Sequence, residues 1–137
     1  MSTVSNESIQ SYINSLDKTD LFYKRAFGAF SVNQKQKTTL IGIAHLILID
    51  DRNKVAEVAL SVDARYRRQG VGTALINQAV TYTEEVNYST LMMHCSNSNT
   101  PMISLARASG FHMKSEALSD LEGSLTLKSI DMNSFEG

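Results

Sequence analysis

The stretch that decides the fold is a pair of apolar segments joined by a polar turn. The first segment is TTLIGIAHLILID (residues 38–50), and the second is KVAEVALSV (residues 54–62). Both are rich in β-branched and other apolar residues, which is typical of strands. Because the turn around residues 51–54 is short, we predict that the two strands form an antiparallel hairpin.

The chain after the hairpin predicts strands that alternate with helices. Apolar residues recur at helical spacing after the glycines, and a single proline sits where a second helix would start. The predicted elements are a helix at 71–86, a strand at 89–96, a helix from Pro101 to about Ser109 with Thr100 as cap and Gly110 as stop, and closing strands at 111–114 and 124–132.

The chain before the hairpin predicts mainly helix. Residues 6–27 show helical spacing, with a second short helix plausible at 20–27, and a strand starting near residues 30–32. NQKQK (33–37) reads as a turn, and MSTVS (1–5) is a poor strand, so an opening strand is expected to be absent or very short. The whole predicts one α/β domain of the α+β type over residues 1–137, with a mostly antiparallel sheet.

Composition narrows the class of protein. The 137 residues suit one globular domain, and a net charge of −1 gives no broad basic surface for nucleic acid. Cys95 is the single cysteine, so no internal disulfide is expected. The polar start MSTVSNESIQ resembles no signal peptide, and the longest apolar run is too short to span a bilayer. These features predict a soluble cytoplasmic protein with no membrane partner, as a monomer or homodimer.

A glycine-rich loop, RRQGVGTAL (67–75), follows the hairpin. It lacks the lysine of a Walker A loop. It also lacks the third glycine of a dinucleotide-binding loop, since Leu75 stands there, and the strand before it belongs to a hairpin rather than to a parallel unit. What remains is Arg67-x-x-Gly70-x-Gly72 between a strand and a helix.

Two interpretations of this loop stay open on the residues alone. In the first, glycine lets the backbone approach an anion, the first turn of the helix presents free N–H groups, and arginine adds charge. The local cluster of Arg65, Arg67 and Arg68 favours that interpretation. In the second, the glycines only allow a tight turn between strand and helix.

The loop also resembles a known signature. VDARYRRQGVGTALI (62–76) is similar to the acyl-CoA signature of the GNAT acyltransferase superfamily, Gln/Arg-x-x-Gly-x-Gly/Ala. Asn99, ahead of a helix that ends in Gly110-Phe111, matches the second family segment. The resemblance covers about residues 38–115 and implies a mostly antiparallel central sheet flanked by helices. It also implies an N-acetyltransferase with acetyl-CoA as co-substrate and an amine as acceptor.

The resemblance assigns roles to individual residues. Residues 67–73 would hold the CoA pyrophosphate through backbone N–H groups, residues 60–62 would pair with the pantetheine arm as an added strand would, and a backbone N–H near Val62 would hold the oxyanion. Asn99 would hydrogen-bond the pantetheine or nearby chain. The residues implied in CoA binding are Leu60, Ser61, Val62, Arg67, Arg68, Gln69, Gly70, Val71, Gly72, Thr73, Asn99 and Met102.

A narrower likeness concerns bacterial protein lysine acetyltransferases of the Pat type. AEVALSV (56–62), NTPMISLARASGF (99–111) and SLDKTDLFYKRAF (15–27) are similar to segments of that group. This likeness implies a protein lysine as acceptor and Glu57 as general base. A small amine or amino acid as acceptor, and a non-catalytic acyl-CoA sensor, stay as alternatives.

Glu57 is also unusual on residues alone, because a carboxylate is out of character in an apolar strand. Alternation places it with Ala59 and Ser61, so a solvent-facing glutamate is the competing interpretation. His45 is the second candidate, as a proton relay, although a packed histidine is the simpler interpretation. The candidate acidic lining for a cationic acceptor is Asp17, Asp20, Glu116, Asp120 and Glu122.

The remaining polar residues suggest no other chemistry. Many GNAT enzymes carry a tyrosine as general acid where this chain has Ala106, so no acid is assigned. His94 and Cys95 are predicted to serve packing, because a cysteine nucleophile needs a base and an orienting partner. No metal is predicted, since His45, His94, Cys95 and His112 lack ligand spacing.

Overall fold

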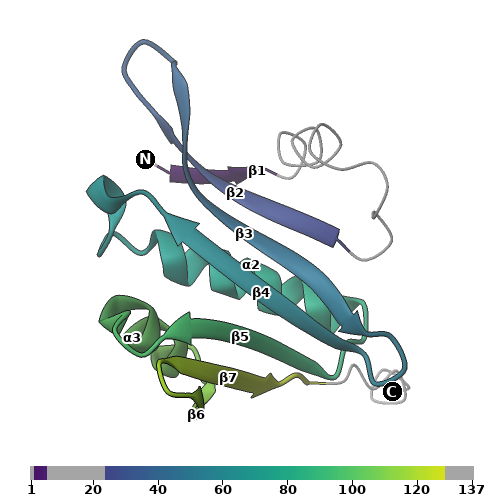
Figure 1. Ribbon diagram of the computed structural model, residues 1–137. Helices are drawn as coiled ribbons and strands as arrows, with labels where there is room; N and C mark the ends of the chain where they lie inside the picture. Colours follow the sequence, from purple (N-terminus) through teal and green to yellow (C-terminus); the bar gives the residue numbers. More distant parts are fainter. Residues whose placement is uncertain (1, 6–23, 129–137) are drawn as a thin grey trace.

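The computed structural model describes residues 2–5 and 24–128 of the chain. The described strands form one seven-stranded sheet in the order β1-β2-β3-β4-β5-β7-β6 (Figure 1). All neighbouring strands are antiparallel except β4 and β5, which confirms the predicted fold class. The elements are β1 Ser2–Ser5, β2 Lys24–Val32, β3 Thr38–Asp50, β4 Val55–Val62, η1 Ala64–Tyr66, α2 Val71–Glu85, β5 Thr90–Ser96, α3 Thr100–Ala108, β6 His112–Ala117 and β7 Asp120–Thr126.

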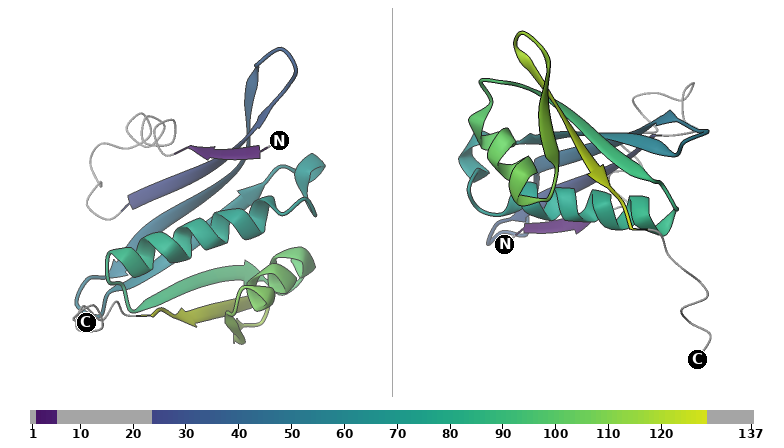
Figure 2. Two further views of the ribbon diagram at one scale, coloured as in Figure 1. Left: turned by 180° about the vertical axis from the view of Figure 1, so that it is seen from behind. Right: turned by 90° about the horizontal axis from the view of Figure 1, so that it is seen from below.

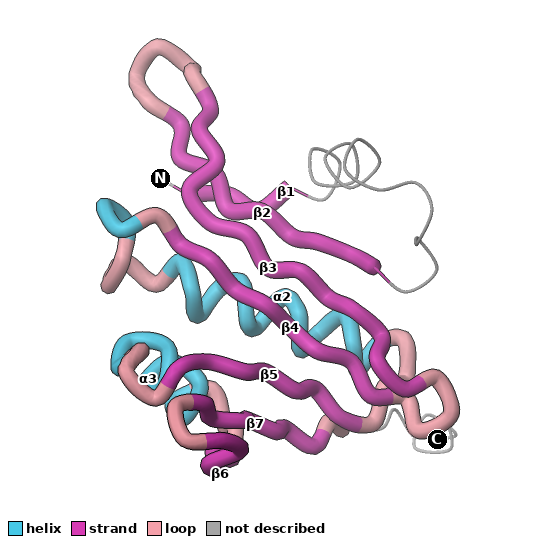
Figure 3. The backbone as a smooth tube through the Cα atoms, in the orientation of Figure 1, coloured by secondary structure: helices cyan, strands magenta, loops and turns pink. Residues whose placement is uncertain are grey.

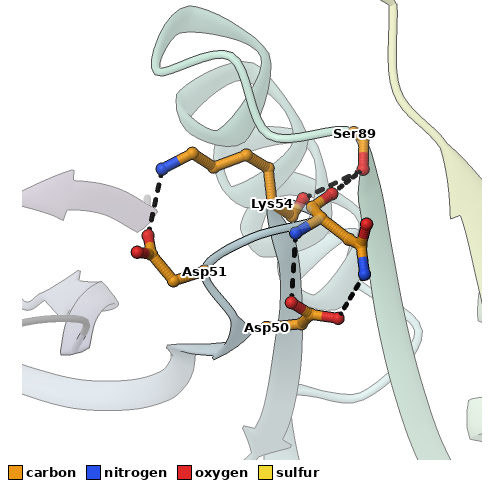
Figure 4. Close-up of polar contacts among 5 residues, drawn as sticks. Asp50, Asp51, Lys54 and Ser89 are labelled. Atoms are coloured by element: carbon orange, nitrogen blue, oxygen red, sulfur yellow. Dashed lines mark hydrogen bonds and ion pairs between the residues drawn. The ribbon is translucent and has the colours of Figure 1, made fainter.

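The predicted hairpin is confirmed as β3 and β4, which pair from Gly42–Val62 to Asp50–Val55. Side chains fix its turn (Figure 4). The Asp50 carboxylate accepts the Asn53 backbone N–H at 3.0 Å and the Asn53 side-chain amide at 2.7 Å. These bonds hold the turn closed, so the two long strands start in register.

The same turn is tied to the start of β5. The Ser89 hydroxyl donates to the carbonyls of Asn53 and Lys54, and the Ser89 N–H donates to the Lys54 carbonyl at 2.7 Å (Figure 4). β4 and β5 pair in parallel, so β4, α2 and β5 form a parallel crossover in which β4 is also a hairpin strand.

The prediction that the hairpin strand belongs to no parallel unit was wrong, because an inner strand has a different neighbour on each side.

The N-terminal prediction is corrected where the structure describes it. Residues 24–27, predicted to be helical, form the first half of β2, and residues 6–23 lie outside the described part of the chain. Phe27 is buried in the core, and its ring meets Tyr82 of α2 edge-on with centroids 5.7 Å apart. The opening strand β1 is present and spans four residues, in line with a very short strand.

Both described helices lie on one face of the sheet (Figure 2; Figure 3). The buried face of α2 packs into a common core with Ala56, Val58, Leu91 and Met93. Alternation then leaves Glu57, Ala59 and Ser61 on the opposite face, as predicted. In the described part of the chain, no helix is long and apolar enough to cross a membrane.

The second helix and the closing strands differ in detail from prediction. Asn99, rather than Thr100, caps α3, and its side-chain oxygen accepts the Met102 N–H at 3.3 Å. Gly110 ends the helix with a φ of +96°, as predicted. The closing strands, predicted at 111–114 and 124–132, lie at 112–117 and 120–126, and residues 129–132 are outside the described part.

Candidate active site

The central feature of the candidate site is the point where β4 and β5 separate. The two strands pair only from Val55–Thr90 to Glu57–Met92. Beyond these pairs no further pairing joins β4 and β5 in residues 24–128, and Figure 1 shows them diverging toward the starts of α2 and α3. The edge of β4 after Glu57 is therefore free to pair with an extended ligand.

Glu57 and His94 meet at this point. The Glu57 Oε1 atom lies 2.6 Å from the His94 Nδ1 atom, a short hydrogen bond between β4 and β5. Both side chains lie on the sheet face opposite the helices, with 31% of Glu57 and 35% of His94 exposed. Glu57 is thus neither deeply buried nor simply solvated, because it has a fixed histidine partner.

Two more carboxylates face the other nitrogen of His94. The His94 Nε2 atom lies 3.4 Å from Glu116 Oε2 and 3.5 Å from Glu122 Oε2. Glu122 is the β7 residue directly opposite His94, and Lys114 of β6 is directly opposite Glu122, with its ammonium 3.6 Å away. His94, Glu122 and Lys114 thus form a row of alternating charge across β5, β7 and β6, and Glu57 of β4 meets His94 diagonally.

The acidic neighbours change the titration of the histidine. The hydrogen bond that His94 donates to Glu57 is the main cause that raises the pKa of His94, with further contributions from the charges of Glu57 and Glu116 and from a hydrogen bond to Glu122. Partial desolvation of the imidazole opposes the rise. The pKa of His94 is raised overall, because the carboxylates stabilise the imidazolium more than burial disfavours it.

This pKa predicts a pH-dependent contribution to stability. Since the pKa of His94 is raised in the folded state, the stabilisation is complete below about pH 6.5 and is lost as pH rises through the folded pKa. His94→Gln is therefore expected to lower the urea midpoint at pH 5.5 more than at pH 9. Urea titrations at both pH values test this, and an equal loss at both would contradict it.

His94, Glu116 and Glu122 also place one nitrogen or oxygen atom each within 4.8 Å of one another. The sequence spacing indicated no such group. Lys114 contacts Glu122, and Glu57 bonds to the other ring nitrogen of His94, so side chains of this protein offset part of the negative charge. We therefore interpret the group as an ion-paired cluster, and the prediction that His94 serves only packing is replaced.

The two glycines of the loop are required for different structural reasons. Gly70 is the N-cap of α2 with a φ of +81°, a conformation that favours glycine, and a Cβ there would meet nothing within 4 Å. At Gly72 a Cβ would lie 2.7 Å from Leu105 Cδ2, so this glycine lets α2 and α3 pack closely. Because Gly70 offers no side-chain cap, the N–H groups of the first turn keep their capacity to bind an anion.

The three arginines of the loop are not equivalent. Arg65 binds Asp63 through Nε at 3.2 Å and Nη2 at 3.1 Å, and these bonds lower the pKa of the Asp63 carboxyl. Arg67 and Arg68 are exposed, and in the described residues they make no ion pair. The two cations available to a bound anion are therefore Arg67 and Arg68.

The other predicted site residues are spread around the separation of β4 and β5. Leu60, Val62 and Met102 pack against the core, whereas Ser61 is exposed. His45 of β3 is opposite Ala59, so it shares the face of Glu57, but the histidine bonded to Glu57 is His94. Among the remaining positions, Gln69 and Thr73 are exposed and Val71 is buried. Asp17 and Asp20 lie outside the described part of the chain.

Two further predictions on the catalytic groups can be compared with the structure. Ala106 is fully buried, and its methyl side chain carries no hydroxyl that could act as an acid. Burial is the main cause that raises the pKa of the Cys95 thiol, and Asp120 adds to it. A raised pKa makes the thiolate scarcer, which agrees with a packing role for Cys95.

Comparison with known proteins places the chain in a family. The model of the acetyltransferase (GNAT) family matches residues 3–111. Among solved structures, the ribosomal-protein-S18-alanine N-acetyltransferase from Escherichia coli superposes with a TM-score of 0.68 at 17% identity, covering 97% of this chain and 98% of that one. An IAA acetyltransferase from Bacillus cereus gives 0.68 at 18% identity, covering 93% of this chain and 100% of the other.

A GNAT-family acetyltransferase from Streptococcus pneumoniae gives a TM-score of 0.68 at 15% identity, covering 90% of this chain and 77% of that one. At such identities the structures establish the fold, and the family match rests on the sequence model. The narrower likeness to Pat-type enzymes stays a prediction. The chain belongs to the acetyltransferase (GNAT) family, and the protein is an acyltransferase.

Proposed function

We propose that the protein transfers the acetyl group of acetyl-CoA to a primary amine, and that the acceptor is a protein lysine. The observation that carries the proposal is the gathering of Glu57, Glu116 and Glu122 on the sheet face opposite α2 and α3, where β4 and β5 separate. An amine acceptor is a cation near neutral pH, so carboxylates attract it. It must also lose a proton before it attacks.

The free energy needed to deprotonate the acceptor amine explains why the reaction needs a base. A lysine amine has a pKa near 10.4, so forming its neutral state at pH 7 costs roughly 4–5 kcal/mol. A positioned base removes this proton and typically gains about 10²- to 10⁴-fold in rate. The sequence predicts Glu57 as this base, with His45, on the same face, as the second candidate for a relay. Because the Glu57 carboxylate is bonded to His94, our proposal places the base at the Glu57–His94 pair.

The placement of CoA follows from the loop and the strand edge. The pyrophosphate would bind the backbone of residues 67–73 with Arg67 and Arg68, and the pantetheine arm would extend β4 along Leu60, Ser61 and Val62. Asn99 and Met102 would flank the arm from α3. This course brings the thioester toward Glu57 and leaves a β4 backbone N–H near Val62 for the oxyanion.

No general acid is assigned in this proposal. With Ala106 in place of the tyrosine that many relatives carry, the departing group leaves as the CoA thiolate, which is a good leaving group. The thiolate then takes a proton from the new amide nitrogen or from water.

The test of the function is the release of CoA thiol. The protein is incubated with acetyl-CoA and a lysine-containing peptide, the same peptide with acetyl-lysine, or spermidine, and free thiol is followed. We expect release that requires the free lysine. Release with spermidine alone would move the acceptor to small amines, and no release with any amine, together with no CoA binding, would overturn the function.

The loop gives a prediction of its own. Replacing both Arg67 and Arg68 by alanine is expected to weaken CoA binding about tenfold or more, because charge-assisted bonds to phosphate are lost. Arg65→Ala is the matched control and is expected to stay within about twofold, since Arg65 is committed to Asp63. Calorimetry measures both, with acetyl-pantetheine, which lacks the pyrophosphate, as a second comparison. An equal loss in the two variants would contradict this assignment.

A further inference from the structure

We propose that His94 is the catalytic base of this site and that Glu57 is its positioning residue, with Glu116 and Glu122 receiving the acceptor ammonium. This inference rests on the acetyl transfer proposed above and assigns its proton step. The observation behind it is that the two nitrogens of one imidazole face different kinds of partner.

The first nitrogen, Nδ1, is hydrogen-bonded to Glu57. At 2.6 Å from Oε1, the Nδ1 atom donates its hydrogen to the carboxylate. When the ring is neutral, this bond places the lone pair on Nε2 and fixes the orientation of the ring. When the ring is protonated, the adjacent carboxylate stabilises the imidazolium. A carboxylate that orients a histidine in this way is a recurring arrangement in general base catalysis.

The second nitrogen, Nε2, faces the carboxylates of Glu116 and Glu122 but makes no short hydrogen bond to either. Its separations of 3.4 Å from Glu116 and 3.5 Å from Glu122 exceed the usual N–H···O hydrogen-bond length of about 2.9 Å. An ammonium held by these two carboxylates would lie beside the lone pair of Nε2. The charges that attract the acceptor thus surround the atom that takes its proton.

The sheet places this atom where the thioester is expected. Glu57 and Met92 are the last pair that joins β4 to β5, and His94 is the next residue of β5 on the same face. His94 therefore stands at the opening between the strands, on the side of the free β4 edge. The tip of the β6–β7 hairpin, near Glu116, lies on the sheet face away from α2 (Figure 2, right). This hairpin brings its acidic residues over the same opening.

The proton step balances as follows. Neutral Nε2 takes one proton from the acceptor ammonium, and the freed nitrogen lone pair forms the N–C bond to the thioester carbonyl. The C–S bond then breaks, and its electron pair leaves with the CoA sulfur. The second proton passes from the new amide nitrogen to the thiolate, directly or through water. The imidazolium releases its proton to solvent, so each turnover yields an amide, CoA thiol and one proton.

The groups around His94 predict the pH dependence of the reaction. Glu57 faces it from β4, Glu116 from β6 and Glu122 from β7, with Lys114 next to Glu122, while His45 shares the same sheet face from β3. The carboxylates raise the pKa of His94, so kcat/KM should rise with pH through a midpoint above 6.5. Removing the Glu57 charge should move this midpoint to lower pH.

The experiment compares H94Q, E57Q and the double variant in acetylation of the lysine peptide, with EDTA present throughout. We expect H94Q to lower kcat by about 10²- to 10⁴-fold, with the KM for acetyl-CoA and CoA binding unchanged. The double variant should be no slower than the slower single variant, because the two residues act as a unit. E57Q should retain a measurable rate whose pH midpoint is lower than that of the wild type. His112→Gln, at an exposed position of β6, is the matched control.

The outcomes separate this inference from the function it rests on. A kcat for H94Q within about threefold of wild type, with E57Q inactive at every pH, would make Glu57 the direct base and overturn the inference while acetyl transfer stands. Losses in the single variants that multiply in the double variant would overturn it too. Wild-type protein that releases no thiol with any amine would instead overturn the function. CoA binding by each variant shows that it is folded.

Discussion

Glu57→Gln is expected to lower kcat for lysine acetylation by about 10²- to 10⁴-fold near pH 7 and to leave CoA affinity within about twofold. The loss is expected whether Glu57 takes the proton itself or orients His94, since both roles need the carboxylate that accepts the 2.6 Å bond. CoA affinity should persist, because the predicted pyrophosphate contacts lie at residues 67–73. Steady-state kinetics and calorimetry on the same preparations measure the two quantities.

This variant also distinguishes an enzyme from a non-catalytic acyl-CoA sensor. A sensor would keep both CoA binding and function after the substitution, whereas an enzyme keeps the binding and loses turnover. Glu85→Gln removes one carboxylate from an exposed position at the end of α2 and is the matched control. Full activity of E57Q across pH 6 to 9 would remove Glu57 from the mechanism altogether.

Phe27→Ala is expected to lower the free energy of unfolding by about 3–5 kcal/mol, the usual cost of deleting a buried aromatic ring. Phe27 is only 1% exposed, lies opposite Ala44 of β3, and meets Tyr82 edge-on. The substitution removes the transfer energy of the ring and leaves a cavity between β2 and α2. Urea unfolding at constant pH measures the loss.

Phe30→Ala is the comparison for this experiment. Phe30 lies on the same strand, next to the register shift at Ala29, and is only partly buried. It is therefore expected to cost less than Phe27→Ala. A larger loss at Phe30 than at Phe27 would contradict the placement of Phe27 in the core between β2 and α2.

Much of the fold was predictable because its signals are local. The hairpin, the helix at 71–85 and the strand at 90–96 each carry their own periodicity, and the structure confirms them within a residue. Residues 24–27 gave the wrong prediction for a physical reason. Ala26, Phe27 and Ala29 are all buried, and a short segment that is buried on both faces lacks the alternation that identifies a strand. Pairing with β3, which the local pattern of these residues does not reveal, decides their conformation.

The candidate site was predictable only in part. The glycine loop and Glu57 stand out from their neighbours in sequence, and the structure brings both to the strands around the opening. His94 gave no such signal, because its partners Glu57 and Glu122 are distant in sequence. The order β4-β5-β7, in which β7 rather than β6 lies next to β5, makes them neighbours. The sequence offered one clue: alternation along the strand places Met92 and His94 on the same face. To find the contact with Glu57, this clue would have had to be combined with the correct strand order.

The position of β6 has a consequence for how molecules of this protein behave together. β6 is an outer strand of the described sheet, and an outer strand offers unpaired backbone groups to any other chain. Lys114 and Glu116, which stand on this strand, put charge along that border. A second copy that added its own strand there would have to desolvate these charged side chains. The residues that frame the opening thereby also discourage aggregation.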